Sequence, residues 1–319
     1  MLHSRFTSCS RISRWPLLPG RGRAITTTRP VPDRPRVDVQ PSEPGAGPNW
    51  HSRPRAGTLV LIGGASDPRG DALAAFVNLA SAARAGPIVG ITSASGNPAA
   101  SSRRWRRDLR TAGLEHAKIP VVATREDASD PRIVEMIENS SGVFLAGGNQ
   151  VKLVSTLSGT PVADAIWAHY ALGGVVGGTS AGAAALTELT LAGNEVDDDG
   201  KLVEQYIGPG LGLLGFRTLI DTHFTQRRRL YRLFVAIADN REIMGLGLDE
   251  DTAMVVKGEI ATVVGKGGVT FVDGRGVRFD NADEVTKGRQ LTLSSLRVGI
   301  VGTGYTFNLR HRELEALLD

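Results

Sequence analysis

The sequence predicts an α/β domain in which helices cover both faces of a mostly parallel sheet. Short apolar runs alternate with helical segments from residue 57 onward. The runs are apolar at consecutive positions, which is typical of strands buried on both faces. Several runs end in glycine-rich turns, at residues 63–64, 147–148 and 177–178. Because parallel α/β sheets bind ligands beyond the carboxyl ends of their strands, these turns mark the expected site.

The predicted strands are short runs rich in Val, Ile and Leu. Residues 58–62 form the first, because an apolar run stops there at Gly63-Gly64. Later runs of the same character are bounded by polar residues or glycines, and they cover residues 88–91, 119–122, 142–145, 174–177, 219–224 and 244–248. Glycines also separate three short runs that are expected as antiparallel hairpin strands at the sheet edge, namely residues 253–256, 260–264 and 269–272.

The predicted helices lie between the strands. Residues 71–85 have a helical composition, and Gly86-Pro87 ends that helix. Residues 105–112, 133–138 and 162–170 are of the same kind. An Ala-rich helix is expected over residues 183–189, directly after a glycine-rich turn. The alternation of these helices with strands is the reason to expect a parallel sheet.

The composition is that of an ordinary globular enzyme, with 41% hydrophobic and 22% charged residues in a chain of 319. Cys9 is the single cysteine, so no intramolecular disulfide and no zinc-binding thiol cluster are expected. No apolar run of about 18 residues occurs, so we expect no membrane-spanning helix. We expect no cofactor and no metal, because the acidic turn at residues 197–200 lacks the downstream glutamate of a calcium loop.

Positive charge is concentrated at the start of the chain. Residues 1–49 hold eight arginines and three carboxylates, whereas the whole chain has a formal charge of +4, so the remainder is about −1. A nearly neutral body does not predict nucleic-acid binding. Residues 1–56 are Arg- and Pro-rich and are expected to be a disordered extension, which leaves residues 57–319 as the catalytic domain. The extension is interpreted as a tail, a start-site error or an organellar transit peptide, and the protein is otherwise expected in the cytoplasm.

Ser180 is the candidate nucleophile. It is the central residue of Gly178-Thr179-Ser180-Ala181-Gly182, which follows a Val-rich strand and opens an Ala-rich helix. A strand, a tight turn and a helix form the context that this serine motif requires, and small neighbours leave room for the strained turn. The start of the helix would direct backbone N–H groups at a developing oxyanion. The alternative is an ordinary glycine-rich turn with a serine cap.

His223 is the candidate general base. It closes an apolar strand, at the sheet edge where Ser180 is also expected. The other histidines fit less well, because His3 and His51 fall in or beside the N-terminal extension, His116 is in a polar connection, and His169 is near a helix end. Position alone leaves open that His223 is a buried or capping histidine.

A third residue, a carboxylate, is needed to orient the imidazole. Residues 244–248 form a strand that Asp249, Glu250 and Asp251 close. The alternation of side chains cannot choose among the three, and a solvated acidic turn is the other interpretation.

Together these segments resemble cyanophycinase and its relatives, a serine peptidase family that also contains aspartyl dipeptidase. The resemblance runs from about residue 57 to the C-terminus. Its most specific segments are residues 144–150, residues 178–183, residues 221–224, residues 247–253 and an arginine signature at 227, 229 and 232. It implies a flavodoxin-like fold of the class I glutamine amidotransferase type, a homodimer, and a peptide substrate such as cyanophycin, a polyaspartate with arginine on each side chain.

The resemblance also implies a role for each site residue. It places a catalytic triad on Ser180, His223 and Glu250, which selects one of the three acidic residues. The chain order Ser, His, Glu separately argues against an α/β-hydrolase, in which the acid precedes the histidine. The implied oxyanion N–H groups are those of Gly148 or Asn149 and of Ala181. The implied substrate-binding residues are Gln150, Asp221, Thr222, Arg227, Arg229 and Arg232.

Two departures concern the substrate. Thr222 stands where cyanophycinase typically has glutamine, and Asn149 stands where an aspartate is common. The three signature arginines suit bidentate binding of carboxylates, although a solvated helix face is the alternative. Asp221 in turn could bind a guanidinium or an amine of the substrate.

Three functions are therefore weighed. The first is hydrolysis of cyanophycin or other β-aspartyl peptides, with release of β-Asp-Arg dipeptides. The second is an α-aspartyl dipeptidase, which is disfavoured because such chains lack the arginine signature. The third is a non-catalytic domain that binds a small ligand, which the presence of all three triad residue types disfavours.

Overall fold

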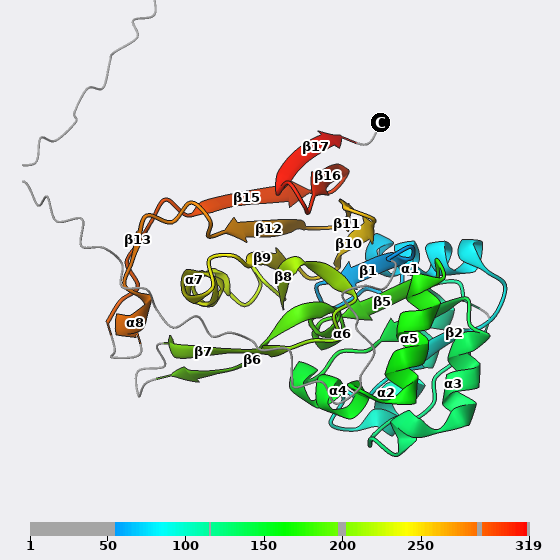
Figure 1. Ribbon diagram of the computed structural model, residues 1–319. Helices are drawn as coiled ribbons and strands as arrows, with labels where there is room; N and C mark the ends of the chain where they lie inside the picture. The colour runs from blue at the N-terminus through cyan, green and yellow to red at the C-terminus, as the bar shows by residue number, and fades with distance from the viewer. Residues whose placement is uncertain (1–54, 115, 197–201, 286–288, 318–319) are drawn as a thin grey trace, which may run out of the picture. The chain divides into compact units, whose positions relative to one another are not determined.

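The computed structural model describes residues 55–114, 116–196, 202–285 and 289–317, and its largest sheet has nine strands (Figure 1). Five of them, β1, β5, β4, β2 and β3, are parallel neighbours in that order. The strands β10, β11, β16 and β17 continue the sheet antiparallel beyond β1. The bounds are β1 Thr58–Ile62, β2 Ile88–Ile91, β3 Ala117–Lys118, β4 Gly142–Leu145, β5 Val175–Thr179, β10 Thr252–Lys257, β11 Ile260–Gly265, β16 Tyr305–Asn308 and β17 Glu313–Leu317.

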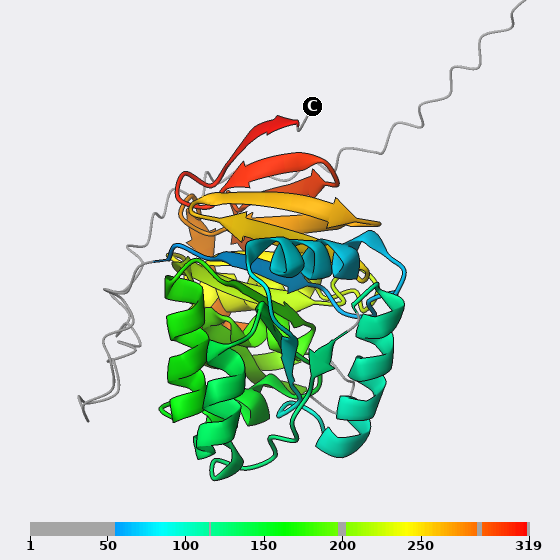
Figure 2. The ribbon, with the colours of Figure 1, turned by 90° about the vertical axis from the view of Figure 1, so that its right-hand side faces the viewer.

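Helices cover both faces of the parallel strands (Figure 2). Side chains alternate along β1, so Leu59 and Leu61 pack into one core layer while Val60 and Ile62 pack into the other. The first layer is closed by α3 Pro131–Glu138, α4 Gln150–Leu157, α5 Pro161–Ala171 and α6 Ala181–Ala185. The second is closed by α1 Asp71–Ala83 and α2 Pro98–Thr111. This is the predicted α/β architecture, with helices on both sides of a parallel core.

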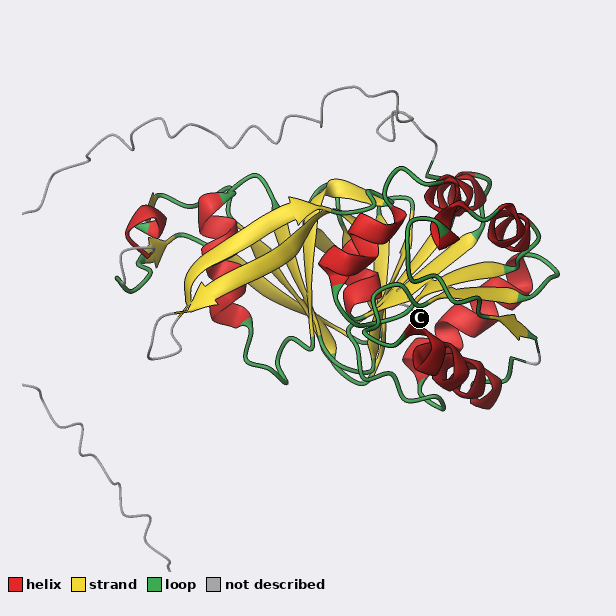
Figure 3. Cartoon of the chain, turned by 90° about the horizontal axis from the view of Figure 1, so that it is seen from below, coloured by secondary structure: helices red, strands yellow, loops and turns green. Residues whose placement is uncertain are grey.

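A second sheet of six strands, in the order β15-β12-β9-β8-β6-β7, lies beside the first. The β6–β7 hairpin is long and extends past the rest of this sheet (Figure 3). Helix α7, Leu230–Asp239, packs its buried face on this sheet. The strand bounds are β6 Thr187–Val196, β7 Leu202–Pro209, β8 Leu214–Thr222, β9 Met244–Leu248, β12 Gly268–Asp273 and β15 Arg297–Gly302. The remaining short elements are η2 Asp127–Ser129, β13 Phe279–Asp280, α8 Ala282–Val285 and β14 Leu293–Ser294.

Several sequence expectations need correction. The runs at 219–224, 244–248 and 269–272 were expected in the same sheet as β5, but they form β8, β9 and β12 of the second sheet. The expected helix over 183–189 ends at Ala185, because Thr187 already begins β6. The strand expected at 119–122 is displaced to β3, at Ala117–Lys118. An apolar run that is buried on both faces does not specify which sheet it joins.

Parts of the sequence interpretation fall outside the described residues. These are residues 1–54 of the predicted extension and the acidic turn at 197–200. Within the residues that are described, no helix is both long enough and apolar enough to cross a membrane.

Candidate active site

Ser180 lies in a strained turn between β5 and α6. Its backbone has φ 52° and ψ −119°, a conformation that non-glycine residues adopt at a cost of about 1–3 kcal/mol. The turn requires glycine on both sides. A Cβ on Gly178 would lie 2.5 Å from the Gly182 carbonyl carbon, and a Cβ on Gly182 would lie 2.1 Å from the Leu145 oxygen. The sequence motif is therefore explained by close backbone packing around the serine.

His223 follows directly after β8 and reaches Ser180 from the second sheet. The Ser180 Oγ and His223 Nε2 atoms are 2.9 Å apart, which is hydrogen-bond distance. The other ring nitrogen, Nδ1, is 2.6 Å from Glu250 Oε1. With Nδ1–H donated to the carboxylate, Nε2 is left to accept the serine proton.

The three carboxylates after β9 have separate partners. Glu250 alone bonds the imidazole. Asp249 accepts hydrogen bonds from the backbone N–H and the hydroxyl of Thr225 and from Gly268 N–H. Asp251 accepts from Asp67 N–H and forms an ion pair with Lys266, with 2.8 Å between Nζ and Oδ2. The turn thus presents one carboxylate to the histidine and uses its neighbours to hold adjacent loops.

The end of β1 binds the backbone beside each triad member. Three consecutive carbonyls, those of Ile62, Gly63 and Gly64, accept the N–H groups of Ser180, His223 and Asp251 at 2.9, 2.7 and 2.9 Å respectively. All three donor residues have φ near +50°. Since Ser180 follows β5 of the first sheet and His223 follows β8 of the second, this short segment fixes the two halves of the site against each other.

Gly64 lies close to the imidazole of His223. A Cβ at this position would lie 2.3 Å from His223 Cε1 and 2.4 Å from Nε2, and Gly64 has φ +104°. We expect Gly64→Ala to displace the ring and to lower kcat by about 10²-fold, as misplacements near 1 Å can do. The measurement is kcat on a peptide substrate beside the thermal unfolding midpoint. Gly173→Ala is the matched control, because Gly173 has φ +95° but nothing within 4 Å. Equal kcat in the two variants would contradict the expectation.

The expected oxyanion donors are not equally available. The Asn149 N–H donates to Ala94 O at 2.8 Å, and the Asn149 side chain accepts from Lys152 N–H as the cap of α4. This leaves the N–H groups of Gly148 and Ala181, for which no protein acceptor occurs among the described residues. Gly147, next to Gly148, lies against Ser180, since a Cβ there would be 3.2 Å from the serine Cβ. Helix α6 has only five residues, so these local N–H groups matter more than the helix dipole that the sequence analysis invoked.

Asp221 binds the chain's own arginines. Its side chain is 1% exposed and forms ion pairs with Arg229 and Arg232. Arg229 also donates to Thr222 O at 2.6 Å. The hypothesis that Asp221 binds a guanidinium or amine of the substrate is therefore corrected, because its carboxylate is covered and already paired. Arg229 and Arg232 are held in fixed orientations rather than lying on a solvated helix face.

The remaining predicted substrate residues differ in accessibility. Arg227 is exposed and close enough to His223 to affect its protonation. Gln150 donates to Leu191 O at 2.6 Å, which fixes its side chain against β6. Thr222 is buried, with 5% of its surface exposed. Of these three, Arg227 is the side chain that is open to solvent.

Burial lowers the pKa of His223 below its ordinary value of 6.5, and the charges of Arg227 and Arg229 act in the same direction. The hydrogen bond to Glu250 opposes this shift. Because its pKa is lowered, the imidazole stays neutral at pH values where an ordinary histidine would already be protonated. Since a general base must be neutral, it remains competent at lower pH than an unperturbed histidine would.

Removing the charge of Arg227 tests this electrostatic effect. Arg227→Gln should raise the pKa of His223 and move the acidic limb of the kcat/KM profile to higher pH. The profile is measured over the acidic range on one peptide substrate. Arg228→Gln is the control, because Arg228 is exposed and does not contribute to the His223 shift. An unchanged limb in Arg227→Gln, or equal shifts in both variants, would contradict this cause.

Among the described residues no group of three or more His, Cys, Asp or Glu side chains is arranged to hold a metal ion. The sequence analysis missed Gln226, whose Oε1 accepts from the Glu250 N–H at 3.1 Å. It placed the Gly63-Gly64 turn at the expected site but did not foresee the contacts of these two glycines with His223 and Asp251. Both features position the triad residues without touching Ser180 Oγ.

A serine hydroxyl bonded to an imidazole that is bonded to a carboxylate, on the edge of a parallel sheet, is the arrangement of a serine hydrolase. The comparisons with known proteins narrow this class. The chain belongs to peptidase family S51, whose family model matches residues 59–264, and it is a serine peptidase of that family.

Several relatives of the chain carry the name cyanophycinase. The chain is 34% identical over 269 residues to the protein of Synechococcus elongatus, with 81% of each chain covered. It is 32% identical over 267 residues to that of Geminocystis herdmanii, covering 82% of this chain and 97% of the relative. The fold is similar to the crystal structure of a peptidase from an acI-B1 Actinobacterium, with a TM-score of 0.59 at 20% identity, covering 79% and 97% of the two chains.

Proposed function

We propose that this protein hydrolyses cyanophycin or related β-aspartyl peptides, cleaving the main chain of the polymer so that β-Asp-Arg dipeptides are released, with Ser180 as nucleophile, His223 as general base and Glu250 orienting the base. The observation that carries the proposal is the continuous chain of hydrogen bonds from Ser180 Oγ through both ring nitrogens to Glu250. The names of the relatives support the substrate class, since they are called cyanophycinases.

The proposed reaction has two halves. Ser180 Oγ attacks the scissile carbonyl carbon while its proton passes to His223 Nε2, and Glu250 stabilises the resulting imidazolium. The Gly148 and Ala181 N–H groups stabilise the oxyanion. The imidazolium then gives its proton to the leaving amine as the C–N bond breaks. Water, deprotonated by the same histidine, hydrolyses the acyl-enzyme and restores the Ser180 hydroxyl.

The arginines favour a substrate with carboxylates. Arg227 is exposed near the base, and Arg229 and Arg232 keep N–H groups beyond those that bond Asp221 and Thr222. Planar guanidinium groups bind carboxylates in bidentate fashion. In cyanophycin the α-carboxyl groups form the main chain and the β-carboxyl groups carry arginine, so the free carboxylates are those of the chain end and of each arginine. The proposed role of these arginines is to bind such a carboxylate.

Product analysis tests the proposal. The purified protein is incubated in parallel with cyanophycin, with β-aspartyl dipeptides and with α-aspartyl dipeptides, and Ser180→Ala is the control. We expect β-Asp-Arg release from the polymer and none from the variant. Cleavage of only the α-aspartyl dipeptides would favour an aspartyl dipeptidase, and cleavage of only the β-aspartyl dipeptides would restrict the substrate to short isoaspartyl peptides.

The homodimer expected from the resemblance stays a proposal. The edge strand β15 supports it, because Val298 and Ile300 are 44% and 71% exposed along the same strand. Light scattering on the eluted protein gives the mass in solution, and a monomer mass would remove the proposal.

A further inference from the structure

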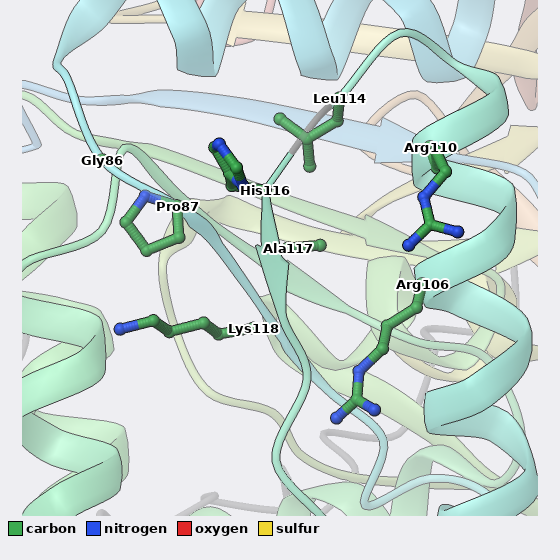
Figure 4. A pocket seen from close by; sticks show the side chains of 8 residues that line it. All are labelled: Gly86, Pro87, Arg106, Arg110, Leu114, His116, Ala117 and Lys118. Carbon is green, nitrogen blue, oxygen red and sulfur yellow. The ribbon is translucent and has the colours of Figure 1, made fainter.

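A hollow of about 510 Å³ lies between α2 and β3, and four of its eight lining residues are basic (Figure 4). Arg106 and Arg110 extend from α2 toward the strand that carries Ala117. His116 and Lys118 come from the opposite side, and the Lys118 side chain extends away from the arginines. The two guanidinium groups and Ala117 thus lie on one side of the strand, and the His116 ring and Lys118 lie on the other, beside Pro87.

The hollow is separate from the candidate active site. Its residues precede or begin β2 and β3, whereas Ser180 follows the carboxyl end of β5. These strands are parallel within one sheet, so the hollow and the serine lie at opposite ends of the strands. The inference below thus does not depend on the proposed function.

The arginines that line the hollow differ from their neighbours on the same helix. Arg104 and Arg107 share the buried Asp108 at 3.1 and 3.2 Å. Arg106 and Arg110 have no carboxylate oxygen within 4.0 Å among the described residues. They are four residues apart on one helix face, where like charges repel. The helix C-terminus favours the charge of Arg110, but Arg106 lies too far from that end to benefit.

One contact orients Arg106 at the wall of the hollow. Its Nη2 donates to Ile119 O at 3.0 Å, which ties the guanidinium to the segment after β3. The remaining N–H groups of that guanidinium, and those of Arg110, are available to a ligand. Planar guanidinium groups bind phosphate and carboxylate oxygens in pairs, and such bonds are about twice as strong as neutral ones.

We propose that this hollow binds a small molecule with two or more negative charges, a phosphate or a polycarboxylate, through Arg106 and Arg110. The volume falls within the range of about 300–1,000 Å³ that small-molecule sites occupy. Leu114, which lines the hollow and is largely buried at 9% exposure, accommodates the ligand's uncharged part. The ligand relieves the repulsion between the two guanidinium groups.

Isothermal titration calorimetry with pyrophosphate and with citrate, at one fixed ionic strength, tests the proposal on the full chain. The double variant Arg106→Gln/Arg110→Gln should bind at least about tenfold more weakly than the native chain. The control Arg103→Gln/Arg104→Gln removes the same charge from the same helix but leaves the hollow intact. It should bind within about twofold of the native chain, because neither Arg103 nor Arg104 lines the hollow.

Each outcome is decisive. Saturable binding of pyrophosphate alone identifies a phosphate ligand, and binding of citrate alone identifies a carboxylate ligand. No saturable binding of either anion by the native chain would overturn the proposal, as would equal losses in the two double variants. Both arginine side chains in the hollow are exposed, so the variants are expected to fold, and circular dichroism verifies this.

Discussion

Ser180→Ala is expected to abolish peptide hydrolysis, with kcat lower by about 10⁵-fold or more. The substitution deletes the one oxygen that lies 2.9 Å from His223 Nε2 and changes nothing else in the turn. Alanine carries the same strain as serine at φ 52°, so the thermal unfolding midpoint should stay close to that of the native protein. The measurement is kcat on the best substrate together with labelling by a serine-directed phosphonate.

The double variant Ser180→Ala/His223→Ala provides the sharper control. If the two residues act as one unit, the double variant should be no slower than Ser180→Ala alone, because the losses are not additive. Additive losses would mean that His223 assists the reaction by another route. Retained hydrolysis in Ser180→Ala would refute the assignment of the nucleophile.

The sequence was most informative where close packing leaves few choices of residue. Gly178 and Gly182 are required because a Cβ at either position would meet backbone atoms within 2.5 Å. The strand, turn and helix around Ser180 therefore leave a pattern of small residues that the sequence alone reveals. His223 could also be placed at a strand end, because the apolar pair Leu219-Ile220 gives way to Asp221 and Thr222 directly before it.

The sequence could not assign the three carboxylates after β9 by itself. Asp251 has φ 49°, so the turn does not follow the regular alternation of a strand, and side-chain direction cannot be inferred from spacing. The resemblance selected Glu250, and the distance to His223 Nδ1 agrees with that choice. Neighbouring contacts to Thr225 and Asp67 involve residues distant in sequence, which no local pattern encodes.

The second sheet was missed for a related reason. Strands β8 and β9 pair in parallel with each other, as the predicted strands of a single sheet would. They lie in a different sheet from β5. In that sheet β8 has β9 on one side and β6, the first strand of the β6–β7 hairpin, on the other. That hairpin begins where an Ala-rich helix was expected to continue. At Thr187 the strand pairing with Leu214 overrides the local helix propensity and determines the conformation.

Asp221→Asn is expected to cause the largest loss of stability among the site variants. The carboxylate is 1% exposed and is shared by two guanidinium groups, and burial together with the nearby positive charges of Arg232 and Arg227 lowers the pKa of Arg229. Neutralising it leaves two half-buried cations without their partner. Breaking a buried ion pair in this way costs about 3–5 kcal/mol, which corresponds to a fall of roughly 6–20 °C in Tm.

Glu259→Gln is the matched control, since Glu259 pairs with Arg310 at the surface, where the side chains are 37% and 61% exposed. Exposed pairs contribute at most about 1 kcal/mol, so its Tm should hardly change. The two unfolding midpoints are measured in the same buffer by calorimetry. A stable Asp221→Asn variant would mean that the arginines are not held by Asp221. In that case the aspartate would again be a candidate to bind the cationic end of a substrate, and KM should then rise without any loss of stability.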